Sequence, residues 1–289
     1  MFAPKHKLKL KHLPKHQVKN QRGFTLIELV TVIVILGVLA TGITSFLRLG
    51  TQNYTEAADR TALVSTVRFL VERLNREVRY ALPSSIRTNG DKNQCLEFMP
   101  IENTMAYLGD LENVQISKIQ GLMFAGDLLT TTQYVVVYAM DSKNIYDSTV
   151  RVGVTEELSS ITPGINPNDI TTINFANPIT IKADSPTKRL YLTGSPVSYC
   201  VENQAIYRYQ TYGFTTYNTN TGTPDISSGG EKVLMAEYVD NYSSSNDMEA
   251  FQTSPASLKR NSLALIRLKF VRNLEEIVFN NVIKVPNVP

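Results

Sequence analysis

The sequence predicts an α+β fold in which a long N-terminal helix packs on an antiparallel β-sheet. An apolar run, residues 24–47, contains one charged residue, and no proline occurs between Phe24 and Leu82, so a single helix can cover the first part of the chain. After Pro83 the sequence changes to short segments rich in β-branched and aromatic residues, separated by polar stretches. A large sheet needs a helix to cover one of its faces, so the long helix and the strands together predict an α+β fold.

The positive charge of the chain is concentrated at its N-terminus. Residues 1–23 hold seven basic residues and no acid: Lys5, Lys7, Lys9, Lys11, Lys15, Lys19 and Arg22. Residues 24–289 hold 22 basic and 26 acidic residues, a formal charge of −4, whereas the whole chain has +3. Basic residues that flank a first apolar segment stay on the cytoplasmic side, so this head is expected to be a cytoplasmic leader. An arm that binds nucleic acid or anionic lipid is the alternative.

The apolar segment is long enough to cross a membrane. Its 24 residues form a helix of about 36 Å, against a hydrocarbon core of ~30 Å. A carboxylate such as that of Glu28 costs about 2.5–3.5 kcal/mol inside a membrane, which indicates that it has a partner. A cut after Gly23 would place a new α-amino group on Phe24, four residues before Glu28, where the two charges can neutralise each other. The simpler alternative is that Glu28 reaches the headgroups.

Residues 22–30, with the sequence RGFTLIELV, resemble the type III signal of type IV pilins and type II secretion pseudopilins. The resemblance implies cleavage between Gly23 and Phe24 by a prepilin peptidase, N-methylation of Phe24 and a role for Glu28 in assembly. It also implies a protein anchored in the inner membrane with its body in the periplasm. An assembly platform in that membrane would then pack the protein with other pilins into a pilus at the cell surface. A secretory signal cut after Ala40 and a plain signal anchor remain as alternatives.

The helix is expected to continue over residues 48–82 as an amphipathic segment. Its apolar residues recur at steps of three, four and seven: Ala57, Val64, Val67, Val71, Leu74, Val78 and Ala81. Such a stripe predicts a helix face that packs on the sheet, and Pro83 predicts the end of the helix. A coiled-coil dimer is the competing explanation of the stripe.

Residues 83–289 are expected to form a β-rich periplasmic domain. The predicted strands are Cys95–Met99, Tyr134–Met140, Val150–Val154, Thr171–Phe175, Val197–Glu202, Ala205–Tyr209, Leu263–Val271 and Ile277–Val285. The polar stretches Ser159–Asp169, Tyr217–Gly230 and Asn241–Ser257 are predicted to be surface loops. The chain would thus consist of a leader (1–23), a membrane and assembly helix (24–47), its amphipathic continuation (48–82) and this domain.

The composition of the body disfavours catalysis. Cys95 and Cys200 lie in predicted strands on the oxidising side of the membrane, which predicts a disulfide, with two buried thiols as the alternative. All three histidines lie in the leader, so the body has no Ser–His or Cys–His pair, and it has no glycine-rich phosphate loop. We therefore expect no enzyme and no metal or cofactor site.

Three weaker patterns contain side chains that could bind a ligand. Each also has a simpler explanation: turn formation for the first, protection of an edge strand by charge for the second, and the frequency of tyrosine in strands for the third. Residues 166–169 (NPND) and 246–249 (NDME) present oxygen ligands suited to calcium. A basic cluster that could touch DNA comprises Lys259, Arg260, Arg267, Lys269 and Arg272. Tyr207, Tyr209 and Tyr212 could stack on a sugar. The negative charge of the body disfavours a nucleic-acid partner.

A second resemblance is to minor pilins of the mannose-sensitive haemagglutinin (MSHA) pilus, in particular the MshO-like kind. The segments that carry it are Gly23–Ala40, Phe46–Arg48, Glu56–Arg60, Phe69–Leu82, Cys95–Pro100 and Val285–Pro289. This resemblance implies a minor subunit that initiates or caps the filament and serves cell adhesion. The alternatives are a minor pseudopilin of type II secretion and a membrane-anchored protein that binds DNA or sugar.

Overall fold

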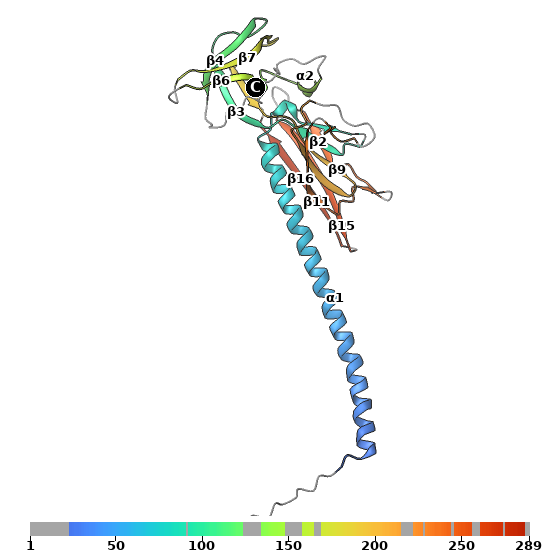
Figure 1. Cartoon of the computed structure of the whole chain (residues 1–289). Coiled ribbons are helices and arrows are strands. Elements are labelled where there is room, and N and C mark those ends of the chain that lie inside the picture. The colour runs from blue at the N-terminus through green and yellow to red at the C-terminus, as the bar shows by residue number, and fades with distance from the viewer. Residues whose placement is uncertain are drawn as a thin grey trace, which may run out of the picture. The chain divides into compact units, whose positions relative to one another are not determined.

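The computed structural model describes residues 23–90, 92–123, 134–147, 158–164, 169–214, 222–227, 229–243, 246–255, 261–273 and 275–286. The chain divides into two compact units between Thr55 and Glu56, and helix α1 (Leu26–Arg79) contributes to both. Its C-terminal part packs on antiparallel sheets, which confirms the predicted α+β fold (Figure 1).

The other elements all belong to the second unit. They are a 3₁₀ turn η1 (Pro83–Ser85), a short helix α2 (Ser142–Tyr146), and strands β1 (Arg87–Asn89), β2 (Cys95–Phe98), β3 (Ile101–Tyr107), β4 (Gln115–Met123), β5 (Tyr134–Val136), β6 (Leu158–Thr162), β7 (Thr171–Thr180), β8 (Arg189–Thr193), β9 (Val197–Glu202), β10 (Ala205–Gln210), β11 (Glu231–Glu237), β12 (Tyr242–Ser243), β13 (Asn246–Asp247), β14 (Phe251–Ser254), β15 (Ser262–Arg272) and β16 (Glu275–Val285).

The buried face of α1 differs by one residue from the predicted stripe. The fully buried positions are Leu63, Val67, Leu70, Leu74 and Val78. Two predicted members, Val64 and Val71, are half-buried, and Ala57 is exposed. The observed steps of four, three, four and four are those of a single helical face, and so are the predicted steps, so periodicity alone did not distinguish the two neighbouring faces. The helix ends at Arg79, three residues before the predicted end.

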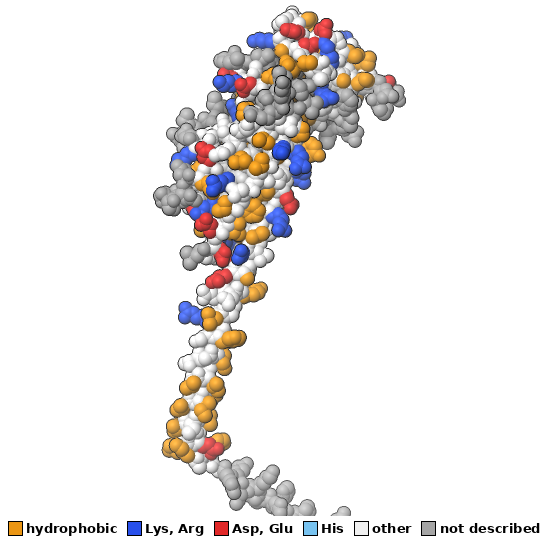
Figure 2. Space-filling view, turned by 180° about the vertical axis from the view of Figure 1, so that it is seen from behind, with side chains coloured by type: hydrophobic (Ala, Val, Ile, Leu, Met, Phe, Trp, Pro, Cys, Tyr) orange, Lys and Arg blue, Asp and Glu red, His pale blue; other side chains and the backbone are white. Residues whose placement is uncertain are grey.

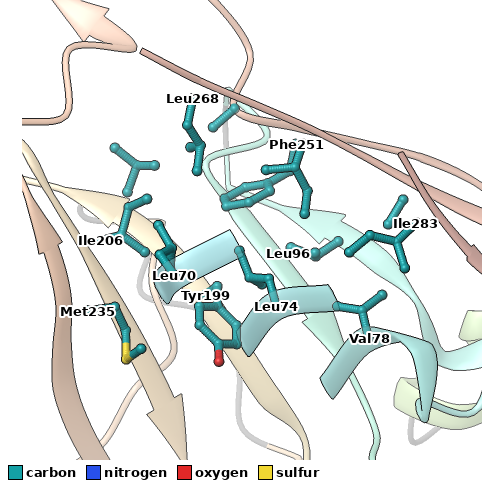
Figure 3. Close-up of a cluster of buried hydrophobic side chains, with 14 of the residues drawn as sticks. Leu70, Leu74, Val78, Leu96, Tyr199, Ile206, Met235, Phe251, Leu268 and Ile283 are labelled. Atoms are coloured by element: carbon teal, nitrogen blue, oxygen red, sulfur yellow. The ribbon is translucent and has the colours of Figure 1, made fainter. Parts of the chain in front are cut away.

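Two antiparallel sheets share one hydrophobic core with α1. The first has the order β1-β2-β9-β10-β11, and the second has the order β14-β15-β16. Figure 3 shows Leu70, Leu74 and Val78 of α1 amid side chains of both sheets, among them Leu96, Leu268 and Ile283. The stripe is thus explained by a helix that covers the sheets of its own chain, as predicted.

The hairpins of these sheets follow from local sequence. Asn203 and Gln204, with φ of 50° and 60°, join β9 to β10 at the predicted place. Two consecutive residues in the left-handed region are typical of a type I′ turn, whose twist suits a two-residue hairpin. Asn273, with φ of 48°, begins the turn between β15 and β16, and β16 starts at Glu275, two residues before the predicted start.

A separate six-stranded sheet is inserted between β2 and β9. Its order is β5-β8-β3-β4-β7-β6, it comprises strands of residues 101–193, and it has a hydrophobic core of its own. The chain leaves the first sheet after Phe98 and returns at Val197, and these two residues are register partners. We call residues 99–196 the insertion; Figure 1 shows its strands β3, β4, β6 and β7 grouped at one end of the unit.

A small apolar cluster joins the insertion to the end of α1. Leu82 packs with Met99, Tyr134, Val136 and Ile145 in this cluster. A backbone hydrogen bond supports the same contact: the Leu82 N–H donates to Met99 O at 2.9 Å. The insertion is therefore packed against the rest of the unit at its base.

Several predicted strands and loops differ from the structure. The predicted strand Tyr134–Met140 stops at Val136, and Tyr138 has a φ of 48° that ends the extended backbone. The predicted loop Asn241–Ser257 contains β14, whose Phe251 is fully buried. The predicted strand Val150–Val154 lies outside the described residues. Strands β3 and β4 were missed because their apolar residues are irregularly spaced among Glu, Asn, Lys and Gln and do not alternate.

Candidate functional site

The junction between Gly23 and Phe24 lies just before the first turn of α1. Residues 23–25 are not helical, and the Phe24 side chain is 80% exposed. Thr25 caps the helix, because the Glu28 N–H donates to Thr25 Oγ1 at 3.3 Å and the Leu29 N–H donates to Thr25 O at 3.2 Å. The peptide bond after Gly23 is thus outside the helical hydrogen-bond ladder, and its cleavage breaks no helical turn.

Glu28 occupies the third helical position in a Thr-x-x-Glu pattern. This spacing is that of a capping box, of which the structure shows one half, the hydrogen bond from the Glu28 N–H to Thr25 Oγ1. The negative charge of the carboxylate also interacts favourably with the positive end of the helix dipole. The described part of the chain gives the Glu28 carboxylate no hydrogen-bond or ion-pair partner. The capping role of Thr25 was not predicted, although the Thr-x-x-Glu spacing indicates it.

The N-terminal part of α1 presents an apolar surface on which three threonine hydroxyls are paired within the helix. Hydrophobic side chains dominate its visible surface in Figure 2, and residues 26–47 are all exposed. The hydroxyls of Thr31, Thr41 and Thr44 donate to backbone carbonyls three or four residues earlier, at 2.7–3.0 Å. Hydrocarbon tolerates such hydroxyls because they are already paired. By length and composition α1 is able to cross a membrane, a test that an N-terminal signal sequence also passes.

A disulfide joins Cys95 of β2 to Cys200 of β9, as predicted. It lies at the base of the insertion, since the β2–β9 pairing continues to Phe98 and Val197. On the same side of the sheet, Tyr209 and Tyr212 bury the two sulfur atoms in a small cluster. The disulfide therefore fixes the two strands between which the insertion leaves and re-enters the first sheet.

A buried acid is paired beside this disulfide. Glu97 is 1% exposed and accepts hydrogen bonds from Arg87 Nε at 2.5 Å, Asn89 Nδ2 at 2.8 Å and the Tyr212 hydroxyl at 2.9 Å. Because every donor belongs to the same side of the sheet, the charge is satisfied within the fold. We assign Glu97 to structure and not to catalysis.

A second acid attaches α1 to the first sheet. Glu77 accepts hydrogen bonds from Arg73 Nε at 2.9 Å, Arg208 Nε at 2.9 Å and the Tyr199 hydroxyl at 3.0 Å. Partial burial acts to raise the pKa of Glu77, but the hydrogen bonds from Arg73 and Arg208 outweigh it, so this pKa lies below its usual value. The network specifies the position of the helix along the sheet.

The predicted sugar-stacking surface is wrong. Tyr209 and Tyr212 are 2% and 3% exposed, so neither offers a ring to solvent. Tyr207 is half-buried, and Lys232 Nζ lies 4.1 Å from its ring centroid. Tyr212 and Ile226, which follow β10 in the chain, pack with Tyr209 in this cluster, a contact that the local sequence does not indicate.

The predicted basic cluster is largely neutralised where the structure describes it. Lys269 pairs with Asp240 at 3.5 Å and with Glu276 at 3.0 Å. Arg272 pairs with Asp59 at 3.0 Å. Lys259 and Arg260 lie outside the described residues. This pairing weakens the case for a DNA-binding surface.

The described residues contain no group of three or more His, Cys, Asp or Glu side chains that could hold a metal ion. Of the two candidate calcium segments, residues 166–168 lie outside the described residues. In the other, Glu249 accepts hydrogen bonds from Asn93 at 3.3 Å and Gln252 at 2.8 Å. That carboxylate thus serves contacts within the chain.

Comparison with known proteins identifies the N-terminal segment. The prokaryotic N-terminal methylation motif, a type IV prepilin-like signal, matches residues 18–44. No curated protein and no solved structure matches the chain. The motif covers the junction, Glu28 and most of the apolar segment, and it implies processing by prepilin peptidase and assembly with other pilins. Together with the apolar helix it fits a protein anchored in the inner membrane.

Proposed function

We propose that this chain is the precursor of a minor pilin-like subunit of an MSHA-type type IV pilus. A prepilin peptidase cuts between Gly23 and Phe24, Phe24 is N-methylated, and the mature subunit enters the filament through α1. The observation that carries the proposal is the exposed, non-helical junction directly before a capped apolar helix, within the matched methylation motif.

Cleavage changes the electrostatics of the subunit. Hydrolysis of the Gly23–Phe24 bond removes seven basic residues and leaves residues 24–289 with a formal charge of −4. It also creates an α-amino group on Phe24, which Glu28 neutralises either in its own subunit or in a neighbour. Two opposite charges paired in hydrocarbon cost less than either charge alone, so this pair sets the axial position of each helix in the filament.

The body supports a place at the tip or start of the filament. Besides the sheets that pack on α1, it carries an insertion with a six-stranded sheet and its own core. A projecting insertion on every subunit would crowd a repeating shaft, whereas an end position accommodates it. The assignment to the MSHA pilus rests on the sequence resemblance of the segments given above, beginning with Gly23–Ala40.

Mass spectrometry of the membrane-extracted protein tests the processing step. The expected first residue is N-methyl-Phe24. A chain that begins at Thr41 would establish a secretory signal, and an uncut chain would establish a signal anchor. Either result contradicts the proposal.

The Glu28→Val substitution tests the assembly step. The variant should be cut and methylated normally, because Thr25 still caps the helix and the junction is unchanged. It should be absent from sheared filaments, because the Phe24 amine then has no carboxylate partner. Glu28→Asp is the matched control and should restore part of the incorporation. Normal incorporation of Glu28→Val would end the charge-pairing account.

A minor pseudopilin of type II secretion shares the same motif. Gene deletion separates the two: loss of MSHA filaments with normal exoprotein secretion supports the pilus subunit. Loss of secretion with normal filaments would assign the chain to the secretion system.

A further inference from the structure

Strand β16 forms a long free edge of its sheet. It pairs with β15 without a bulge from Glu275 to Val285, and the order β14-β15-β16 leaves its other side open. Within the described residues, its backbone forms hydrogen bonds with β15 and with no other element. An open edge presents unpaired N–H and C=O groups to which another strand can add.

The hydrogen bonds of β15 show which residues of β16 face the open side. The Arg267 and Val271 N–H groups donate to Ala250 O at 2.8 Å and Tyr238 O at 2.9 Å, and Lys269 O accepts from Asp240 N at 2.8 Å. These three residues thus turn their backbone away from β16. In an antiparallel pair, the residues opposite them also turn theirs away.

The opposite residues are Asn280, Glu276 and Val278. By the same alternation, Val282 and Lys284 complete the set. Five residues at every second position therefore direct N–H and C=O groups to the open side, a regular template for an added strand.

This edge lacks the features that usually prevent strand addition. Residues 277–283 (IVFNNVI) contain no charge, proline or glycine. The other long edge strand, β11, carries Glu231, Lys232 and Glu237 and pairs with β10 through a bulge. Charges and bulges are the common protection of edge strands, so β11 is protected whereas the centre of β16 is not.

The side chains on the outer face of this edge are apolar at the centre and charged at the ends. Val278 and Val282 are 42% and 53% exposed, and Leu265, which is paired with Val282, is 40% exposed. Glu276 and Lys284 lie at either end of the set. A complementary segment would place aliphatic side chains beside the valines, a base beside Glu276 and an acid beside Lys284.

We propose that β16 accepts an extended segment of a neighbouring, different subunit as a fourth strand of its sheet. The segment has aliphatic residues four positions apart, a polar residue between them and opposite charges at its ends. The choice of a filament neighbour as the occupant rests on the proposed function. The open edge itself does not depend on it.

A second copy of β16 also fits this pattern, in an antiparallel alignment centred on Asn280. However, the body part of α1 runs in the same direction as β16, since Asp59 contacts Asn273 and Asn75 contacts Asn281. An antiparallel pair of β16 strands would therefore place the two body helices in opposite directions. Subunits that pack through parallel α1 helices do not meet in this way, which favours a segment from a different subunit.

The test uses a peptide with the sequence of residues 275–285 as a probe, because it matches the pattern when aligned antiparallel to β16. A fluorescent form is titrated with the full chain in detergent micelles, and binding is followed by anisotropy. We expect saturable binding, with empty micelles as the blank. A peptide N-methylated at every second position, on the groups that face β16, should bind about tenfold or more weakly.

Two substitutions at one position separate backbone pairing from side-chain contact. Asn280→Pro removes an N–H that faces the open side and no hydrogen bond to β15, so the fold is retained, and binding should weaken about tenfold or more. Asn280→Ala keeps the N–H and should bind within about threefold of the natural chain. Disulfide mapping of Cys95–Cys200 checks the fold of both variants.

Equal binding by Asn280→Pro and the natural chain would overturn the proposal, as would the absence of saturable binding. A disulfide-linked dimer formed by Asn280→Cys in the full chain would assign the edge to a second copy and overturn the choice of a different subunit. Failure of cleavage at Gly23 would overturn the proposed function and leave these binding results unaffected, so the two failures are distinguishable.

Discussion

At the scale of single residues, two glutamates on α1 have opposite environments. Glu28 is exposed at the start of the helix, without a partner in the described chain. Glu77 is held by Arg73, Arg208 and Tyr199 at the surface of the first sheet. An acid without a partner on an apolar helix is suited to a contact between subunits. An acid with three donors belongs to the fold of its own subunit.

Glu77→Gln should destabilise the body by about 2 kcal/mol, because charge-assisted hydrogen bonds are replaced by weaker ones. The pKa of Glu77 is lowered in the folded state, so its stabilisation is complete above the unfolded pKa of about 4.3 and is lost as pH falls through the folded value. Urea midpoints measured from pH 7 to pH 3 should therefore fall less steeply in the variant.

Glu72→Gln is the matched control, because Glu72 is exposed on the same helix. Its free energy of unfolding should stay within about 0.5 kcal/mol of that of the natural chain at each pH. Parallel pH profiles for Glu77→Gln and the natural chain would show that the network does not contribute to acid sensitivity.

At the scale of elements, α1 serves two environments with one continuous helix. Residues 26–47 present an apolar surface around the whole helix, whereas the body part buries a single stripe. The change from all-round to one-sided apolarity separates the segment that is able to cross a membrane from the segment that packs on the sheets. The predicted stripe included Val64 and Val71, but the helix buries Leu63 and Leu70 between the two sheets.

Leu70→Ala tests this corrected stripe. Leu70 is fully buried in the shared core, so the substitution should cost about 2–5 kcal/mol. Val64→Ala, at a half-buried position, should cost below about 1.5 kcal/mol. Urea denaturation of the full-length variants measures both. The reverse order would show that the helix packs with the originally predicted face.

At the scale of the whole molecule, the fold is an α1-and-sheet unit into which a second sheet is inserted. The disulfide and the pairing of Phe98 with Val197 hold the point of entry and exit. The insertion has its own core, and the small cluster around Leu82 joins it to the rest. The insertion is thus attached to the rest of the unit at its base, through the disulfide-linked strands and this cluster.

Replacement of residues 99–196 by Asn-Gly tests this modularity. A two-residue turn can join β2 to β9, because Phe98 and Val197 are register partners. The shortened chain should still form the Cys95–Cys200 disulfide and should still be cut after Gly23. Peptide mapping without reduction and mass spectrometry of the membrane fraction measure the two outcomes. Loss of the disulfide would show that the first sheet needs the insertion to fold.

The sequence by itself predicted α1 to within three residues at either end, the disulfide partners and the strands β9, β10, β15 and β16. These features depend on local signals: an uninterrupted apolar run, the two cysteines, and alternation flanked by turn residues. Only the tertiary structure decided the buried face of α1, the partners of Glu77 and Glu97, the insertion and the open edge of β16. These features depend on contacts between segments that are far apart in the sequence, and local periodicity does not predict such contacts.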